Sequence, residues 1–196
     1  MKLPAAVFLL FFFELSFAQN KDTLYSLSAD IGLGYSRYLT TLEFMDLNKN
    51  GFSGTFRVMW HPEHLISMGF ETGYQYLYSI RSEISSEEFG SSSLEASMIS
   101  VPVLFVASMI IFPESLPNFE LNGGWGAFFM FNYGNLYGSS IYSSVFSLGY
   151  HAGASYLQPL NDDIAIGGEI KYFYISKLQD SDLSFLFILS YKFLRW

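Results

Sequence analysis

The sequence predicts an all-β fold, an eight-stranded antiparallel up-and-down transmembrane β-barrel. Eight stretches of roughly ten residues alternate apolar with polar or glycine positions, which is a strand pattern because successive side chains leave the pleat on opposite faces. The apolar face is rich in aromatic residues and recurs in too many consecutive strands for one small core to bury. The connections alternate between long and short, as in barrels whose apolar face meets lipid and whose polar face lines the lumen.

Composition and an export signal agree with this class. Of the 196 residues, 51% are hydrophobic, 19% aromatic and only 14% charged, which is unusually aromatic for a soluble domain. Residues 1–18 are expected to be a signal peptide, because Lys2 precedes an apolar run and Ala18 offers a small residue for cleavage. Residues 19–196 are then the barrel domain. The absence of cysteine excludes disulfides and a lipid anchor on cysteine.

Charge and hydropathy exclude two further classes. A formal net charge of −8 argues against a nucleic-acid partner, which needs basic patches. The apolar run 98–112 contains Pro102 and is shorter than the about 20 residues that a membrane-spanning helix needs. We therefore expect this run to be a strand.

The alternation predicts the strands in order at 25–39, 52–60, 65–78, 97–110, 119–132, 145–157, 164–175 and 183–194. Tight turns marked by Pro62, Pro113 and Pro159 join some of them, and proline suits a turn because it cannot extend a ladder of hydrogen bonds. The longer connections 40–51, 79–96, 133–144 and 176–182 are expected to be four external loops, with both termini in the periplasm.

The stretch 65–78 shows the two faces most clearly. Its apolar parity carries Ile66, Met68, Phe70, Thr72, Tyr74, Tyr76 and Tyr78. The opposite parity is polar or small, and across the strands it includes Gly32, Gly34, Gly69, Gly73, Gly124, Gly126, Gly149, Gly153 and Gly167. Glycine on this face lets strongly curved strands close round a narrow interior. Eight strands make a barrel that its own side chains fill, or that holds one small ligand.

Outward-facing aromatic residues gather at the strand ends. Beside the long connections lie Tyr74, Tyr76, Tyr78, Phe129, Phe131, Tyr172 and Tyr174. Trp60 and Tyr156 close strands beside the short turns. These positions fit two girdles of amphipathic rings between hydrocarbon and water.

Several short stretches carry a family resemblance: the signal peptide, residues 69–74, 100–103 and 122–126, and the aromatic last strand. With these features the chain resembles the small outer-membrane β-barrel proteins of Gram-negative bacteria, a broad porin-like family. The resemblance implies a location in the outer membrane and insertion by the outer-membrane assembly machinery, which reads a terminal aromatic residue. Trp196 is terminal, but Phe193 shares the parity of Tyr191 and Leu189 and is the alternative end of the strand.

Ionisable residues at lumen positions form the candidate site. They are Asp30, Arg57, Glu71, Glu120, His151, Glu169, Lys171 and Lys192. We interpret them as a structural ion network that fills the lumen and satisfies buried charges. A gated ion path and a small polar ligand site remain alternatives, since both need a cavity that a sequence does not show.

No catalytic, cofactor or metal site is expected. His151 has Ser147 and Ser155 nearby in the sequence, but one histidine with a serine nearby is weak evidence for a serine–histidine catalytic site. Glu71 and Glu120 could act as a pair of carboxylates, but the sequence shows no nucleophile to accompany them. Residues 46–51 open like a calcium loop, but the twelfth position is Arg57 where an acid is required. His61 and His64 lack the further ligands of a zinc site. Residues 32–34 have no following helix pattern and so form no dinucleotide fingerprint.

The expected function is that of a non-enzymatic outer-membrane barrel whose external loops serve a structural, adhesive or partner-binding role. Its expected partners are the outer-membrane lipid bilayer and an extracellular or envelope protein. Narrow-pore transport through the polar lumen is the first alternative. A secreted lipocalin-like carrier of a hydrophobic ligand is the second, although it would place the lumen-parity glycines on the surface.

Overall fold

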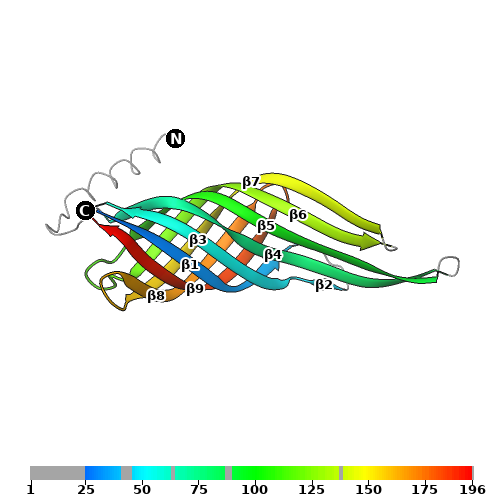
Figure 1. Cartoon of the computed structure of the whole chain (residues 1–196), viewed down its shortest axis with the longest axis horizontal. Coiled ribbons are helices and arrows are strands. Elements are labelled where there is room, and N and C mark those ends of the chain that lie inside the picture. Colours follow the sequence, from blue (N-terminus) through cyan, green and yellow to red (C-terminus); the bar gives the residue numbers. More distant parts are fainter. Residues whose placement is uncertain (1–24, 41–45, 63–64, 87–89, 137–138, 196) are drawn as a thin grey trace, which may run out of the picture.

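The computed structural model describes residues 25–40, 46–62, 65–86, 90–136 and 139–195 (Figure 1). The expected signal peptide and Trp196 lie outside these residues. Every regular element in the described part is a strand: β1 (Ser26–Leu39), β2 (Leu47–Asn48), β3 (Asn50–His61), β4 (Ile66–Ser86), β5 (Gly90–Ile110), β6 (Phe119–Leu136), β7 (Ser139–Pro159), β8 (Ile164–Ile175) and β9 (Asp180–Arg195). No helix in the described part is long and apolar enough to cross a membrane.

Eight of these strands close into a ring. Antiparallel pairing runs in the order β4, β3, β1, β9, β8, β7, β6 and β5, and β5 pairs again with β4. The first and last strands seal the barrel, with Asp30 opposite Ser190 in the β1–β9 ladder. β2 is a two-residue strand added to the outer end of β4, where Leu47 pairs with Ile80. The predicted eight-stranded up-and-down antiparallel barrel is confirmed.

Two of the predicted external loops are wrong in their extent. The segments 79–96 and 133–144 are largely strand, because β4 and β5 stay paired out to Ser86 and Gly90 and β6 and β7 out to Leu136 and Ser139. The two hairpins also pair with each other up to Glu95 and Asn135. They form a sheet that continues past the ends of the other strands, at the right of Figure 1. At the opposite end lie the start of β1 and the end of β9.

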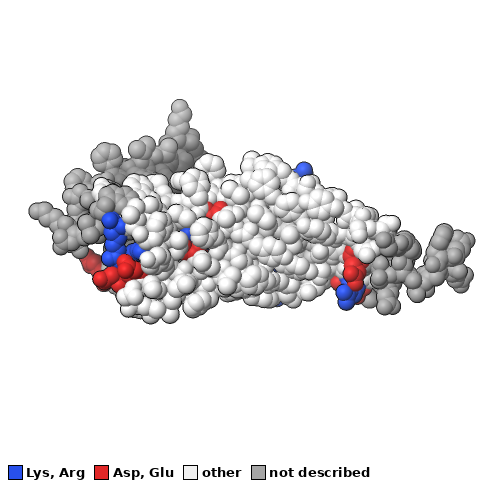
Figure 2. All heavy atoms as spheres, viewed as in Figure 1, with Lys and Arg blue, Asp and Glu red and all other residues white. Residues whose placement is uncertain are grey.

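The outside of the barrel is apolar along the middle of the strands. Phe70 is 67% exposed, Trp125 69% and Phe187 60%, and each lies on the predicted outward parity within the eight-stranded ring. On the face seen in Figure 2, charged side chains gather mainly towards the two ends. Such a band of exposed large apolar side chains is stable in lipid and unfavourable in water.

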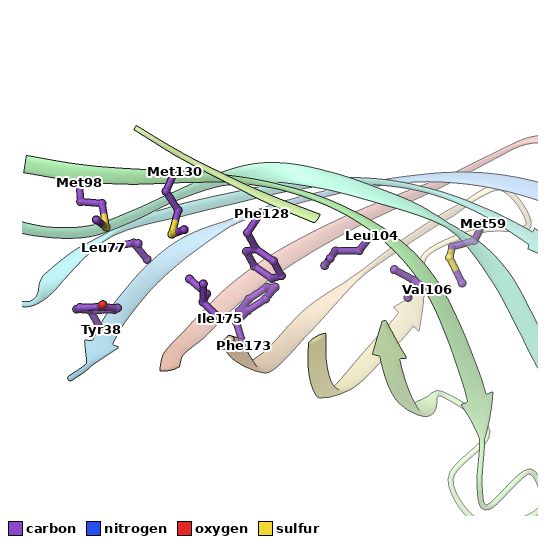
Figure 3. Close-up of a cluster of buried hydrophobic side chains, with 10 residues drawn as sticks. All are labelled: Tyr38, Met59, Leu77, Met98, Leu104, Val106, Phe128, Met130, Phe173 and Ile175. Atoms are coloured by element: carbon purple, nitrogen blue, oxygen red, sulfur yellow. The ribbon is translucent and has the colours of Figure 1, made fainter. Parts of the chain in front are cut away.

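The inside is filled by side chains of the opposite parity. Ten buried hydrophobic residues form one cluster: Tyr38, Met59, Leu77, Met98, Leu104, Val106, Phe128, Met130, Phe173 and Ile175. Figure 3 shows them strung along the barrel, with Tyr38 and Leu77 towards one end and Met59 and Val106 towards the other. The strands curve tightly enough that a Cβ on Gly126 would meet the carbonyl oxygen of Val103 on β5. The predicted role of the lumen glycines is confirmed at this position.

One residue of the predicted outer girdle is placed on the wrong face. The β4–β5 ladder shifts register between Tyr76 and Tyr78, so that Tyr78 pairs with lumen-facing Met98. Tyr78 packs against the buried cluster, with its ring 5.7 Å from that of Tyr38. A β-bulge inserts one extra residue into the alternation and therefore reverses the parity that follows it.

We expect a charged side chain on the outward face to destabilise the barrel. Phe70→Arg or Val103→Arg should lower the free energy of unfolding by about 2–4 kcal/mol, because lipid at mid-strand depth cannot solvate a guanidinium group. Reversible unfolding in lipid vesicles measures the change. Leu116→Arg is the matched control, since Leu116 lies exposed in the turn between β5 and β6. A loss below half a kcal/mol at both strand positions would contradict the orientation of the strands.

Candidate functional site

The strand register places three charged residues side by side on the lumen wall. Asp30 on β1 is opposite Arg57 on β3, and Arg57 is opposite Glu71 on β4. All three side chains are buried. Even spacing along each strand keeps them on the face that points inward.

Arg57 is the centre of this group. Its Nε lies 3.0 Å from Asp30 Oδ2, and its Nη1 lies 3.0 Å from Glu169 Oε1 and 3.7 Å from Glu71 Oε2. Glu169 belongs to β8, three strands away from β3 round the ring. The guanidinium group therefore links its two neighbours on the wall to a strand on the far side. Its several fixed donors suit such a multiple contact.

Lys171 makes a second contact between strands on opposite sides of the lumen. Its Nζ is ion-paired with Glu71 on β4 and lies 3.5 Å from Glu169 Oε2 on its own strand. β4 and β8 are diametrically opposite in the ring, so this pair spans the lumen. The Lys171 side chain is wholly buried, and its ammonium group lies 5.9 Å from the centre of the Phe173 ring.

Neutral polar groups complete the cluster. Asn122 Nδ2 donates to Glu169 Oε1 over 2.8 Å, and Ser28 Oγ donates to Asp30 Oδ1 over 3.2 Å. The five charged residues have three carboxylates against two cations. The remaining negative charge explains why neutral donors are required beside Glu169 and Asp30, since a buried carboxylate without hydrogen bonds is costly.

Three of the predicted site residues lie outside the ion-paired group. Glu120 is partly buried, is hydrogen-bonded to Ser108 and makes no ion pair among the described residues. Lys192 is exposed near the end of β9, although it has the lumen parity, because β9 there approaches the mouth of the barrel. His151 is buried but makes neither an ion pair nor a hydrogen bond in the described part.

His151 packs as an aromatic ring. It packs against Phe173 in a tilted arrangement with ring centres 5.5 Å apart, and it lies over Gly124, where a Cβ would meet its imidazole. Ser147 and Ser155 each lie four residues from His151 on β7, roughly 13 Å along an extended strand. Ser147 instead accepts from the backbone N–H of Lys177. The geometry supports packing for His151, whose ring nitrogens have no hydrogen-bond partner among the described residues and reach no serine hydroxyl there.

Two other predicted positions have structural contacts. His61 bridges strands at the end of the barrel near the termini, with Nε2 2.8 Å from Ser28 Oγ and Nδ1 2.7 Å from Ser67 Oγ. His64 lies outside the described residues. In the segment 46–51, Asn48 Oδ1 accepts from the backbone N–H of Asn50, which is a local turn contact. Among the described residues no three His, Asp or Glu side chains converge as metal ligands would.

Sequence reasoning missed some of the polar lumen. Ser53, Gln75 and Ser100 are buried, and the register sets them side by side on β3, β4 and β5. Their side chains have no protein partner in the described part. Their positions in the alternating pattern could have identified them as lumen residues, because uncharged polar residues alternate with the outward aromatic residues in the same way as the charged ones. Buried waters are the usual partners of such groups.

The pair across the lumen gives a quantitative prediction. Lys171→Met should destabilise the barrel by about 3–5 kcal/mol, because it removes the nearer cation from buried Glu71 and leaves only Arg57, whose Nη1 lies 3.7 Å away. Adding Glu71→Leu should recover part of this loss, and unfolding of both variants in lipid measures the coupling.

Arg81→Ala is the control, since Arg81 pairs with Glu95 at the exposed outer end. An exposed pair contributes at most about 1 kcal/mol. Additive effects of Lys171→Met and Glu71→Leu would show that the two side chains do not interact.

Solved structures of several proteins have the same architecture. Ail, the attachment invasion locus protein of Yersinia pestis, solved with the heparin analogue sucrose octasulfate, is 17% identical with a TM-score of 0.53. Neisserial surface protein A is 12% identical with a TM-score of 0.51, and a major outer membrane protein of Thermus thermophilus is 13% identical with a TM-score of 0.57. Each match covers 86% of this chain and 99% of the other chain.

No protein-family model matches the chain, and no curated protein matches it in sequence. The similarity to the solved structures is therefore a similarity of fold. The proteins that share it are outer-membrane proteins, which agrees with the apolar outer surface and with the predicted location. The chain has the fold of the small outer-membrane β-barrel proteins.

Proposed function

We propose that this protein is a non-enzymatic, non-conducting barrel of the outer membrane, whose extended outer end binds a partner outside the cell. The observation that carries the proposal is the contrast between the lumen of the barrel and the sheet that extends beyond the barrel. The lumen holds a cluster of buried hydrophobic side chains and an ion pair that crosses it, whereas the β4–β5 and β6–β7 hairpins continue beyond the other strands of the ring.

The filling of the lumen supports the absence of a pore. Met59 and Val106 lie in one half, the Glu71–Lys171 pair crosses the middle, and Phe128 and Phe173 contact each other beyond it. An eight-stranded ring is narrow enough for its own side chains to fill. The acidic excess of the ion cluster is consistent with a few buried waters and does not require a continuous ion path.

The surface supports membrane insertion over the lipocalin alternative. A carrier of a hydrophobic ligand needs its apolar face inside, but Phe70, Trp125 and Phe187 are exposed on the outside. Phe193 is also exposed on the outward face near the end of β9, where an aromatic signal for the outer-membrane assembly machinery is expected. Catalysis has little support, because His151 is buried and has no nucleophile within reach.

The conductance of the barrel tests the proposal directly. The full-length protein refolded into planar lipid bilayers should give no channel events above those of protein-free membranes, because buried hydrophobic side chains and the ion pair across the lumen occupy its interior. A general porin refolded in the same way is the positive control. Steady, voltage-independent channels would instead support the narrow-pore alternative.

The orientation of the barrel predicts where the chain is accessible. An epitope inserted at Gly90, at the tip of the β4–β5 hairpin, should be labelled on intact cells because hairpin tips bury little backbone. An epitope inserted at Pro62, in the turn between β3 and β4, should be labelled only after the outer membrane is opened. Labelling of intact cells at Pro62 alone would mean that the barrel has the opposite orientation.

A further inference from the structure

A concave site lies on the outer face of the sheet, where the two long hairpins leave the barrel. The cavity measures about 650 Å³ and is lined by residues of β4, β5, β6 and β7. Most of its lining side chains have the lipid-facing parity: Tyr76, Ser79, Arg81, Glu95, Ser97, Tyr133, Asn135, Ser140 and Tyr142. The site is therefore separate from the lumen and its ion cluster.

The register explains why the sheet is hollow here. The shift between Tyr76 and Tyr78 brings Ser79 onto the outer face directly opposite Ser97. Ser97 is in turn opposite Tyr133 on β6. Two adjacent serines thus replace the large aromatic side chains that cover this face closer to the membrane, and they form a small polar floor.

Aromatic rings form the walls. Tyr133 and Tyr142 are cross-strand partners with ring centres 5.4 Å apart, and Tyr142 also stacks on Phe131 at 6.3 Å. Tyr133 is 48% exposed and Tyr142 59%, so ring surface remains open to a ligand. Tyr76 lines the cavity from the β4 side.

Charge and hydrogen-bonding groups lie at the rim furthest from the membrane. Arg81 and Glu95 are opposite each other, and Arg81 Nη2 lies 2.9 Å from Glu95 Oε1. Asn135 is opposite Glu95 and Ser140 is opposite Asn135. The rim offers both donors and acceptors, and the ion pair neutralises its charge.

We propose that this cavity is a binding site for a neutral saccharide. A sugar ring has an apolar C–H face that packs on an aromatic ring, and hydroxyl groups at its edge that both donate and accept hydrogen bonds. Tyrosine walls with a serine, asparagine, arginine and glutamate rim provide both kinds of contact. A phosphate or sulfate group fits less well, because Glu95 already neutralises Arg81, the one cationic side chain among the described lining residues.

The position of the site admits two sources of the saccharide. It lies just beyond the outward aromatic residues, so it can take the head group of a glycolipid in the same leaflet or a glycan from outside. The proposal names the partner class of the outer end and rests on that end facing outward, but not on the lumen being closed.

The test uses the full-length protein in phosphatidylcholine nanodiscs. One arm measures binding of soluble neutral glucose and galactose oligosaccharides, and the other compares nanodiscs with and without monogalactosyl diacylglycerol by crosslinking at the site. Binding in either arm supports the proposal and identifies the source. Tyr142→Ala and Arg81→Ala should each weaken binding about tenfold or more, since they remove an aromatic wall and a rim donor.

Tyr191→Ala is the matched control, because Tyr191 is an exposed tyrosine on the outward face near the other end of the barrel. It should leave binding unchanged. Absence of binding in both arms, equal loss in the Tyr191→Ala control, or binding of only phosphorylated or sulfated sugars would overturn the proposal. If the Gly90 epitope is nevertheless labelled on intact cells, the saccharide site alone is rejected and the proposed function remains.

Discussion

The ion pair between Glu71 and Lys171 is the contact on which the interior of this barrel depends. It joins the diametrically opposite strands β4 and β8, and Arg57 on β3 contacts the carboxylates of Glu71, Glu169 and Asp30. In the low-dielectric interior each charge is tolerable only because the others are in place. The pairing therefore connects opposite walls of the barrel through its interior.

The lipid-facing side imposes the complementary constraint. Each strand separates hydrocarbon from an interior that holds the ion cluster and the buried hydrophobic cluster, so every position must suit one of two very different environments. Glycines such as Gly126 allow neighbouring strands to approach at the curvature this requires. A strand that slipped by one residue would put Phe70 inside and Glu71 into lipid, which makes the register strongly determined.

Alternation was sufficient to predict the ring of eight strands and the lumen side of Asp30, Arg57, Glu71, Glu169 and Lys171. It was not sufficient for the outer hairpins. Polar residues such as Ser79 and Glu95 predict a loop, because they break the alternation of apolar and polar positions that marks a membrane-spanning strand. In the structure, strand pairing nevertheless continues through them. The bulge at Tyr76 has no sequence signal of its own, so Tyr78 was assigned to the wrong face. The partner of Lys171 lies 100 residues away across the lumen, a distance that only closure of the ring determines.

The central claim is that the apolar face of the barrel meets lipid and that side chains fill its lumen. Spin labels placed one at a time at residues 102–107 of β5, in lipid bilayers, test this claim most directly. Positions 103, 105 and 107 face outward and 102, 104 and 106 face inward. Oxygen, which concentrates in lipid, should relax the labels at the outward positions only, and a water-soluble nickel chelate should reach none of the six. Contact of the nickel chelate with labels at the inward positions would mean a water-filled lumen, and contact at the outward positions would mean that this face does not lie in lipid.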